Sequence, residues 1–145
     1  MTSFAAPLPQ IQARIAESFQ LQGMMVTLGA KLVLVADGEV HIELPYAKHL
    51  SQQHGYIHAG AIASIVDTAC GYAALTKGPS GSDVVTAEFK INLMRPAIGD
   101  SFLAIGRVVN AGKNLSVCSG EVHAYTGQSS KVVAIMQATM VILRP

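Results

Sequence analysis

The sequence predicts an α+β fold in which one curved antiparallel sheet of about six strands wraps around a long central helix. Residues 58–76 are almost entirely small or apolar, as expected of a helix that other elements enclose. Two strand-like segments precede this stretch and four follow it. Half of the 145 residues are hydrophobic and only 13% are charged, which suits one core in a single domain spanning 1–145.

The N-terminal part is predicted to contain a loose segment and a short helix. Residues 1–8 show no pattern, and Pro9 stands where a helix can begin because its missing N–H costs nothing there. An apolar stripe with four-residue spacing follows, formed by Ile11, Ile15 and Phe19. We expect Gly23 to end this helix and residues 24–28 to form an apolar connection.

The strands are predicted from turn signals and alternation. Residues 31–36 and 39–44 flank Asp37-Gly38, a strong two-residue hairpin signal. After residues 78–81 the apolar period becomes two, and one face is predicted to carry Val85, Ala87, Phe89, Ile91 and Leu93. Three more strands are expected near 101–110, 114–125 and 131–143. The last is apolar on both faces and should lie inside the sheet.

Asp67 lies near the middle of the predicted central helix. The carboxylate and the high content of Ala, Gly and Ser favour a buried helix over a membrane span. An ionised carboxylate buried without a partner costs several kcal/mol or more. Asp67 therefore either caps a loop or faces a wet subunit interface, or it lines a cleft where a carboxylate acts chemically.

The start of the same helix is the second candidate feature. The first turn, His58-Ala59-Gly60-Ala61, offers unpaired backbone N–H groups beside small side chains. The helix dipole adds partial positive charge there, so such a terminus can stabilise an oxyanion. Taken alone, an ordinary helix start explains the same residues.

The stretch 52–67 resembles the signature of the PaaI-like (phenylacetate-pathway type) hotdog-fold acyl-CoA thioesterases. That family shows Asn or Gln, a Gly three residues on, then His-Gly-Gly, and an acidic residue nine beyond the His. The spacing is kept by Gln52, Gly55, His58, Gly60 and Asp67. Segments 92–100 and 112–115 resemble the strand end and the hairpin that follow in the family, and the likeness runs from about residue 24 to the C-terminus.

The resemblance implies a role for each matching residue. Asp67 would be the general base that activates water, or the nucleophile that attacks the thioester. The Ala59 N–H would polarise the carbonyl, Gln52 would orient the carbonyl or the water, and Thr86 would lie beside the water. The family shares its site between subunits, so we expect a homodimer at least, joined along the 83–93 strand, and a homotetramer of two such dimers.

One position departs from the family, which usually has Gly where this chain has Ala59. The contact there is a backbone N–H, which Ala keeps, while its methyl group can narrow the acyl pocket. Gly60 and His58 are expected at the substrate, and His58 is expected to hold its loop by hydrogen bonding more than to act as a base. The acyl pocket or plain core would contain Phe19, Met24, Met25, Leu28 and Tyr72.

Coenzyme A carries phosphates, so basic residues should ring the entrance. The candidates are Lys90, Arg95 and Lys113, and for each a solvated surface charge is an equally good interpretation. A formal net charge of +1 without a basic cluster argues against a nucleic-acid partner.

The predicted function is hydrolysis of an acyl- or aryl-CoA thioester to the free acid and CoA, with no cofactor and no metal. The histidines match no zinc-ligand spacing. The alternatives are a non-catalytic acyl-CoA binding module and an enoyl-CoA hydratase. Residues 1–8 lack the features of a signal peptide, so a cytoplasmic location without membrane attachment is expected. Cys70 and Cys118 are predicted to be reduced, buried thiols.

Overall fold

The computed structural model describes residues 8–145. Its helices and strands follow one another in the order α1 (Leu8–Leu21), α2 (Gly23–Leu28), β1 (Lys31–Ala36), β2 (Glu39–Pro45), a 3-10 turn (Lys48–Leu50), α3 (Ala59–Leu75), β3 (Asp83–Leu93), β4 (Ser101–Ala111), β5 (Leu115–Thr126) and β6 (Ser129–Leu143).

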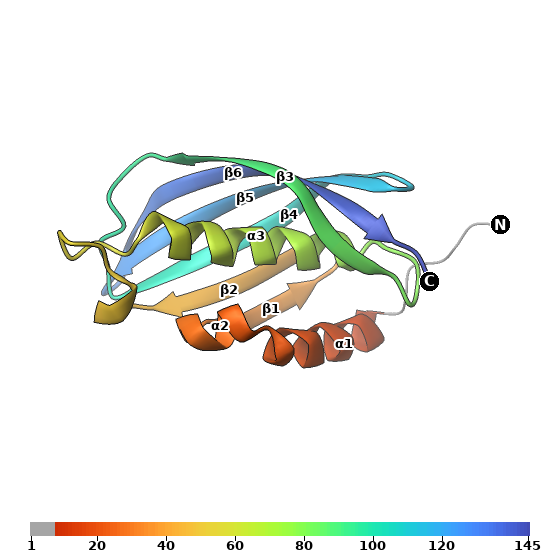
Figure 1. The fold of residues 1–145 in the computed structure, drawn as a ribbon, viewed down its shortest axis with the longest axis horizontal. Helices are drawn as coiled ribbons and strands as arrows, with labels where there is room; N and C mark the ends of the chain where they lie inside the picture. Colours follow the sequence, from red (N-terminus) through yellow and green to blue (C-terminus); the bar gives the residue numbers. More distant parts are fainter. Residues whose placement is uncertain (1–7) are drawn as a thin grey trace.

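The six strands form one antiparallel sheet in the order β1-β2-β4-β5-β6-β3. The sheet curves around α3, while α1 and α2 lie on the open side near β1 (Figure 1). The predicted hotdog architecture is therefore confirmed, and β6 lies inside the sheet as expected. β3 forms one edge and pairs only with β6.

Two glycines allow α3 to approach the sheet closely. Gly106 of β4 and Gly120 of β5 lie opposite each other in the ladder, beneath the middle of α3. A Cβ atom at Gly106 would lie 2.4 Å from the carbonyl carbon of Ala69. The helix backbone therefore rests almost directly on the sheet backbone, which fixes the height of α3 within the fold.

α3 is mostly buried along its 17 residues. Its partners are the inward faces of β2, β3, β4, β5 and β6. Within residues 8–145, no helix is both long and apolar enough to cross a membrane.

A β-bulge changes the predicted faces of β3. The ladder with β6 passes directly from Thr86 to Glu88, so Ala87 has no partner. The predicted alternation, which placed Val85, Ala87 and Phe89 on one face, is broken at this bulge. Thr86 lies opposite the buried Met140, with its Oγ1 3.4 Å from the Met140 sulfur. Bulges commonly re-aim a side chain in this way beside functional sites.

The N-terminal helix ends at Leu21, and a second helix that was not predicted follows it. Residues 24–28, expected to form a connection, belong to α2, which Gly23 begins. Met25 and Leu28 are buried, and this burial favours a helical turn over an extended link. Of the segment expected to be loose, only Leu8 lies within the described residues, and it begins α1.

The outer face of the sheet carries a row of ion pairs across β2, β4 and β5. Arg107 lies between two carboxylates, 3.0 Å from Glu39 and 3.2 Å from Glu121. Each carboxylate also contacts a histidine, His41 at 2.5 Å and His123 at 3.1 Å. This row ties three neighbouring strands together on the side away from α3.

Candidate active site

Asp67 and Thr86 meet in a small cleft between α1, α3 and β3. The Thr86 hydroxyl donates a hydrogen bond of 2.8 Å to Asp67 Oδ1. The cleft has a volume of about 160 Å³. The residues that line it are Ser18, Gln22, Asp67, Thr68, Gly71, Tyr72, Asp83, Val84 and Thr86. The bulge at Ala87 makes this contact, because it turns Thr86 toward the helix.

Burial controls the ionisation of Asp67. The partly apolar surroundings raise the pKa of Asp67 above the ordinary value of an aspartic acid, and the hydrogen bond from Thr86 partly opposes that shift. No cation lines the cleft among the described residues. A carboxylate with a raised pKa and one free oxygen is suited to accept a proton from water.

The start of α3 opens into a second cleft of about 410 Å³. His58 is the N-cap residue, and its Nδ1 accepts a hydrogen bond of 2.8 Å from the Gly60 N–H. The Ala59 N–H, in contrast, makes no hydrogen bond to any residue in the described part of the chain. One free backbone donor, backed by the helix dipole, therefore faces this cleft.

Gln52 lines the same cleft beside Ala59. Its Oε1 accepts a hydrogen bond from the His54 N–H, and its backbone N–H donates to the Tyr56 carbonyl at 2.8 Å. The loop thus fixes the orientation of the side-chain amide. Its Nε2 makes no hydrogen bond within residues 8–145, so it is available as a second donor beside Ala59.

The two clefts share no lining residue. Asp67 lies eight residues after Ala59 on α3, which corresponds to about 12 Å along the helix axis. A thioester carbonyl bound at Ala59 is therefore out of reach of Asp67 in the same chain.

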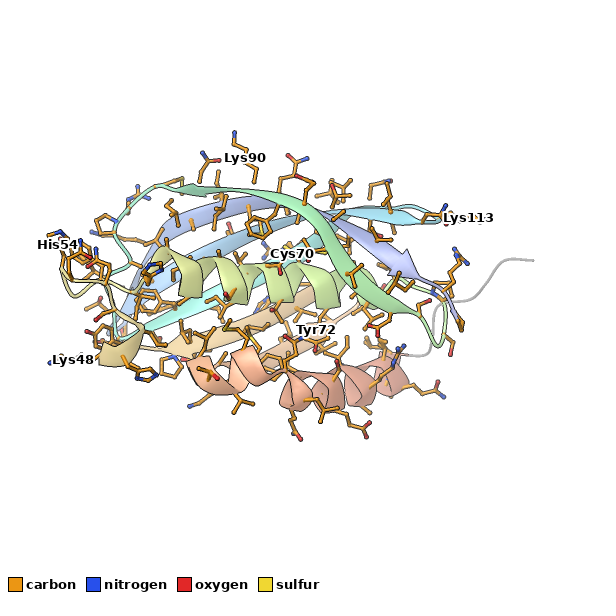
Figure 2. All side chains as sticks on the ribbon, in the orientation of Figure 1. Lys48, His54, Cys70, Tyr72, Lys90 and Lys113 are labelled. Atoms are coloured by element: carbon orange, nitrogen blue, oxygen red, sulfur yellow. The ribbon has the colours of Figure 1, made fainter. Side chains whose placement is uncertain are left out.

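The basic candidates lie in three different places. Arg95 lines the cleft at the start of α3, and its guanidinium donates a hydrogen bond of 2.6 Å to the Val132 carbonyl. Lys90 faces a separate groove on the outer side of the sheet. Figure 2 shows Lys113 in the β4–β5 turn, at the opposite end of the molecule from His54.

No sequence pattern singles out Lys131. This lysine lines a shallow depression together with Arg95, because β6 pairs with β3. The two residues are 36 positions apart in the chain, so only the strand register reveals their proximity.

Both cysteines are buried free thiols, as predicted. Burial raises the pKa of the Cys118 thiol to about 11 and that of Cys70 further still. Neither is therefore poised as a nucleophile. The described residues contain no cluster of three or more His, Cys, Asp or Glu side chains arranged to hold a metal ion.

Comparison with known proteins places the chain in a family. Residues 54–131 match the thioesterase superfamily. The chain belongs to this superfamily. A thioesterase family protein from Silicibacter pomeroyi has a solved structure that is 36% identical, covers 93% of this chain and 99% of its own, and superimposes with a TM-score of 0.91.

Two further proteins extend the comparison. The Escherichia coli PaaI protein from the phenylacetic acid degradation operon is 22% identical and shares the fold, with a TM-score of 0.83 over 95% of this chain and 97% of its own. A presumed esterase from Saccharolobus solfataricus is 33% identical over 62% of this chain. The match spans 64% of that relative, which is less than two thirds of its length. Membership of the thioesterase superfamily is therefore confirmed, and the closer likeness to the PaaI-like group stays a prediction.

Proposed function

We propose that the protein is an acyl-CoA thioesterase whose active site forms between two copies of the chain. The supporting observation is the separation of the two half-sites, with Asp67 and Thr86 in one cleft and Gln52 and Ala59 in another. Each half-site alone lacks a component that thioester hydrolysis needs. The first has a carboxylate but lacks the helix-terminal N–H donor, and the second has the N–H and amide donors but lacks a carboxylate.

The edge strand β3 offers a way to join them. Asp83, Val84 and Thr86 line the acid's cleft, while Leu93 lines the cleft at the start of α3. If two β3 strands pair in antiparallel fashion about a centre near residue 88, the N-terminal end of one strand lies beside the C-terminal end of the other. The acid of each chain then faces the helix terminus of its partner.

The surface of β3 fits this pairing. Nearly all of its 11 residues are exposed, including Val85 at 49%, Phe89 at 43% and Leu93 at 51%. A long edge strand with exposed apolar side chains is normally covered, because it otherwise pairs with other chains at random. We therefore propose a homodimer joined along β3, and we keep the tetramer as a prediction.

In the proposed reaction, water attacks the thioester carbonyl while Asp67 accepts its proton. The C–S bond then breaks and the proton passes from Asp67 to the departing CoA thiolate, so the products are the free acid and CoA. The Ala59 N–H and the Gln52 amide of the partner subunit stabilise the negative charge that develops on the carbonyl oxygen. Thr86 holds the second carboxylate oxygen and so orients the base. The same geometry allows direct attack by Asp67, which expels the CoA thiolate and forms an anhydride that water then hydrolyses to the free acid and the carboxylate of Asp67. Both routes use water alone as co-reactant and need no cofactor.

Arg95 and Lys131 are proposed to bind phosphates of coenzyme A, because they lie together beside the cleft at the start of α3. The hydratase alternative fits less well. It needs a histidine that acts on the substrate, whereas His58 uses its Nδ1 to accept the hydrogen bond from the Gly60 N–H that caps α3. The cytoplasmic location stays a prediction.

The first experiment measures CoA release from aryl-, short-, medium- and long-chain acyl-CoA esters. Wild type is compared with Asp67→Asn, for which we expect a loss of roughly 10²- to 10⁴-fold in kcat. Turnover that survives in Asp67→Asn would contradict the role of the acid. Well-folded wild type that binds these esters without turnover would instead indicate the non-catalytic binding module.

A second experiment removes one backbone donor. Ala59→Pro deletes the N–H at the first helical position, where proline is tolerated, and His58 already has the extended backbone that a following proline needs (φ −59°, ψ 138°). We expect a loss of about 10²- to 10³-fold in kcat. The matched control, Ala59→Gly, keeps the N–H and should retain activity.

A third experiment tests the shared site directly. Asp67→Asn and Ala59→Pro chains are mixed, unfolded and refolded together. Half of the resulting dimers contain one chain of each kind, and each of these has one intact site, so about a quarter of the wild-type activity should return. Mixtures as inactive as the separate variants would show that each chain uses its own two clefts.

A further inference from the structure

The cap of α3 depends on the protonation state of one side chain. His58 Nδ1 accepts its hydrogen bond from the Gly60 N–H at 2.8 Å. A ring nitrogen that accepts a hydrogen bond carries no hydrogen, so the imidazole is neutral and its hydrogen lies on Nε2. The cap therefore exists for one form of His58 only.

Gly60 makes room for the imidazole ring. A Cβ atom at this position would lie 3.0 Å from His58 Nδ1, and ordinary van der Waals contact begins at 3.4 Å. No atom of another element comes within 4 Å of that Cβ position. A side chain on residue 60 would thus push the ring away from the N–H that the ring caps, and it would disturb little else.

The imidazole decides which donor of the helix start stays free. The Ala61 and Ile62 N–H groups donate to the His58 carbonyl at 3.0 and 3.3 Å. The Gly60 N–H is taken by the ring. Of the four N–H groups that open α3, only that of Ala59 has no partner in the part of the chain that the structure describes.

A protonated His58 cannot keep this contact. An imidazolium carries a hydrogen on both nitrogens and has no acceptor, so the Gly60 N–H would face another N–H beside the positive end of the helix dipole. The backbone of His58 is held, because its N–H donates to the Leu50 carbonyl at 2.9 Å. The ring would therefore turn away and release the Gly60 N–H as a second, competing donor for the carbonyl oxygen.

The charges around the ring act on its protonated form. Arg95 and Tyr56 line the same cleft, and no carboxylate does among residues 8–145. Within one chain Arg95 thus opposes the imidazolium. The proposed dimer, in contrast, brings Asp67 of the partner subunit to this cleft, and a ring that has left Gly60 would be drawn to that carboxylate and occupy the base.

We infer that His58 is a positioning residue that acts through Gly60 as a proton-dependent switch. The neutral imidazole holds the helix start in the form that presents the Ala59 N–H alone, and a proton on Nδ1 abolishes that form and the activity with it. This inference rests on the proposed function, because it takes the Ala59 N–H as the donor to the thioester carbonyl.

The first test compares the pH dependence of kcat/KM for CoA release from the ester that wild type hydrolyses fastest. Two protons, one on Asp67 and one on His58, should inactivate wild type in acid, so kcat/KM should fall by about 100-fold per pH unit where both titrate. In His58→Asn the amide oxygen caps the helix and does not titrate. This variant should stay active to lower pH and lose only about tenfold per unit.

Two variants separate the switch from a loss of structure. His58→Leu has no acceptor and should lower kcat roughly 5- to 10-fold at pH 8 with KM nearly unchanged, and His58→Asn should restore most of that loss. His49→Asn changes an exposed histidine of the 3-10 turn and should keep the wild-type profile. A His58→Asn protein with the acid limb of wild type would overturn the inference alone.

Nuclear magnetic resonance of the imidazole nitrogens reads the switch without substrate. At pH 8 His58 should carry its hydrogen on Nε2, and the Gly60 amide should shift along the titration curve of the His58 ring. Gly60→Ala should move the acid limb to higher pH, because a displaced ring is held less firmly in its neutral form. A hydrogen on Nδ1 at pH 8, or an unresponsive Gly60 amide, would overturn the inference alone. Wild type that turns over no ester would overturn it together with the proposed function.

Discussion

Substituting alanine for Gly106 tests whether contact between the backbones of α3 and the sheet sets the geometry of the site. The new Cβ would lie 2.4 Å from the carbonyl carbon of Ala69 and 2.5 Å from the nitrogen of Cys70. Ordinary van der Waals contact begins at 3.4 Å, so α3 and β4 must separate by the difference, about 1 Å. Both contact atoms belong to the helix backbone and cannot rotate away.

Two effects should follow from that displacement. Overpacking of this kind costs about 1–3 kcal/mol of unfolding free energy. In addition, α3 carries both Asp67 and the Ala59 N–H, and a displacement of about 1 Å can lower turnover by about 10²-fold. Gly120→Ala should cost less, because its Cβ meets the side-chain atoms of Val66 at 2.5 Å and Cys70 at 3.0 Å, which can shift.

The assay combines urea unfolding, followed by far-UV circular dichroism, with CoA release by the folded variants. Gly23→Ala is the matched control, since a Cβ there has nothing within 4 Å. It should change the unfolding free energy by less than about 0.5 kcal/mol. A Gly106→Ala protein with wild-type stability and turnover would refute the reasoning.

Three further predictions concern charge. Because burial raises the pKa of Asp67, the stability that Asp67 contributes is complete below the ordinary pKa of aspartic acid and is lost as pH rises through the raised pKa. Asp67→Asn should therefore have a higher melting temperature than wild type at pH 8 and no higher a melting temperature at pH 3. Equal melting temperatures of the two proteins at both pH values would contradict this. Thr86→Val removes the bond that lowers the pKa of Asp67, so the acidic limb of the kcat/KM profile should move to higher pH; an unmoved limb would exclude Asp67 as the titrating base. Hydrogen bonding to His41, with help from Arg107, lowers the pKa of Glu39, so its stability contribution is present above the ordinary pKa of glutamic acid and is lost as pH falls through the lowered value. Glu39→Gln should thus lower the melting temperature at pH 7, and the difference should shrink in acid.

The sequence predicted the architecture well because periodicity records which side chains are buried. The apolar helix, the Asp37-Gly38 hairpin and the alternating strands all follow from that rule. The alternation rule did not predict the break after Thr86, because a bulge shifts the alternation by one residue and the residues around Ala87 carry no turn signal. The family resemblance placed Thr86 near the water, and the bulge gives the physical reason for its contact with Asp67.

The components of the site were harder to predict than the fold. The resemblance placed Asp67 and Ala59 in a site shared between subunits, and a rise of 1.5 Å per residue keeps the two residues of one chain about 12 Å apart along the helix axis. Arg95 and Lys131 come together only through the pairing of β3 with β6. Tyr72 was expected among the acyl-pocket or core residues, but its hydrogen bonds to α1 and Gln22 depend on helix packing that no local pattern encodes.

The strand β3 has a consequence for how activity depends on protein concentration. It supplies the hydrogen-bond donor for the acid, and as an edge strand it is held by one neighbour only. Edge strands of this kind are among the first elements to open locally, and a second copy paired along β3 would hold Thr86 against Asp67. Dissociation on dilution would then have two effects on the site of each chain. It would remove the partner's oxyanion donors, and it would loosen the strand that orients the chain's own acid. Specific activity would therefore fall on dilution in step with the fraction of dimer, which makes the abundance of the protein a regulator of its own chemistry.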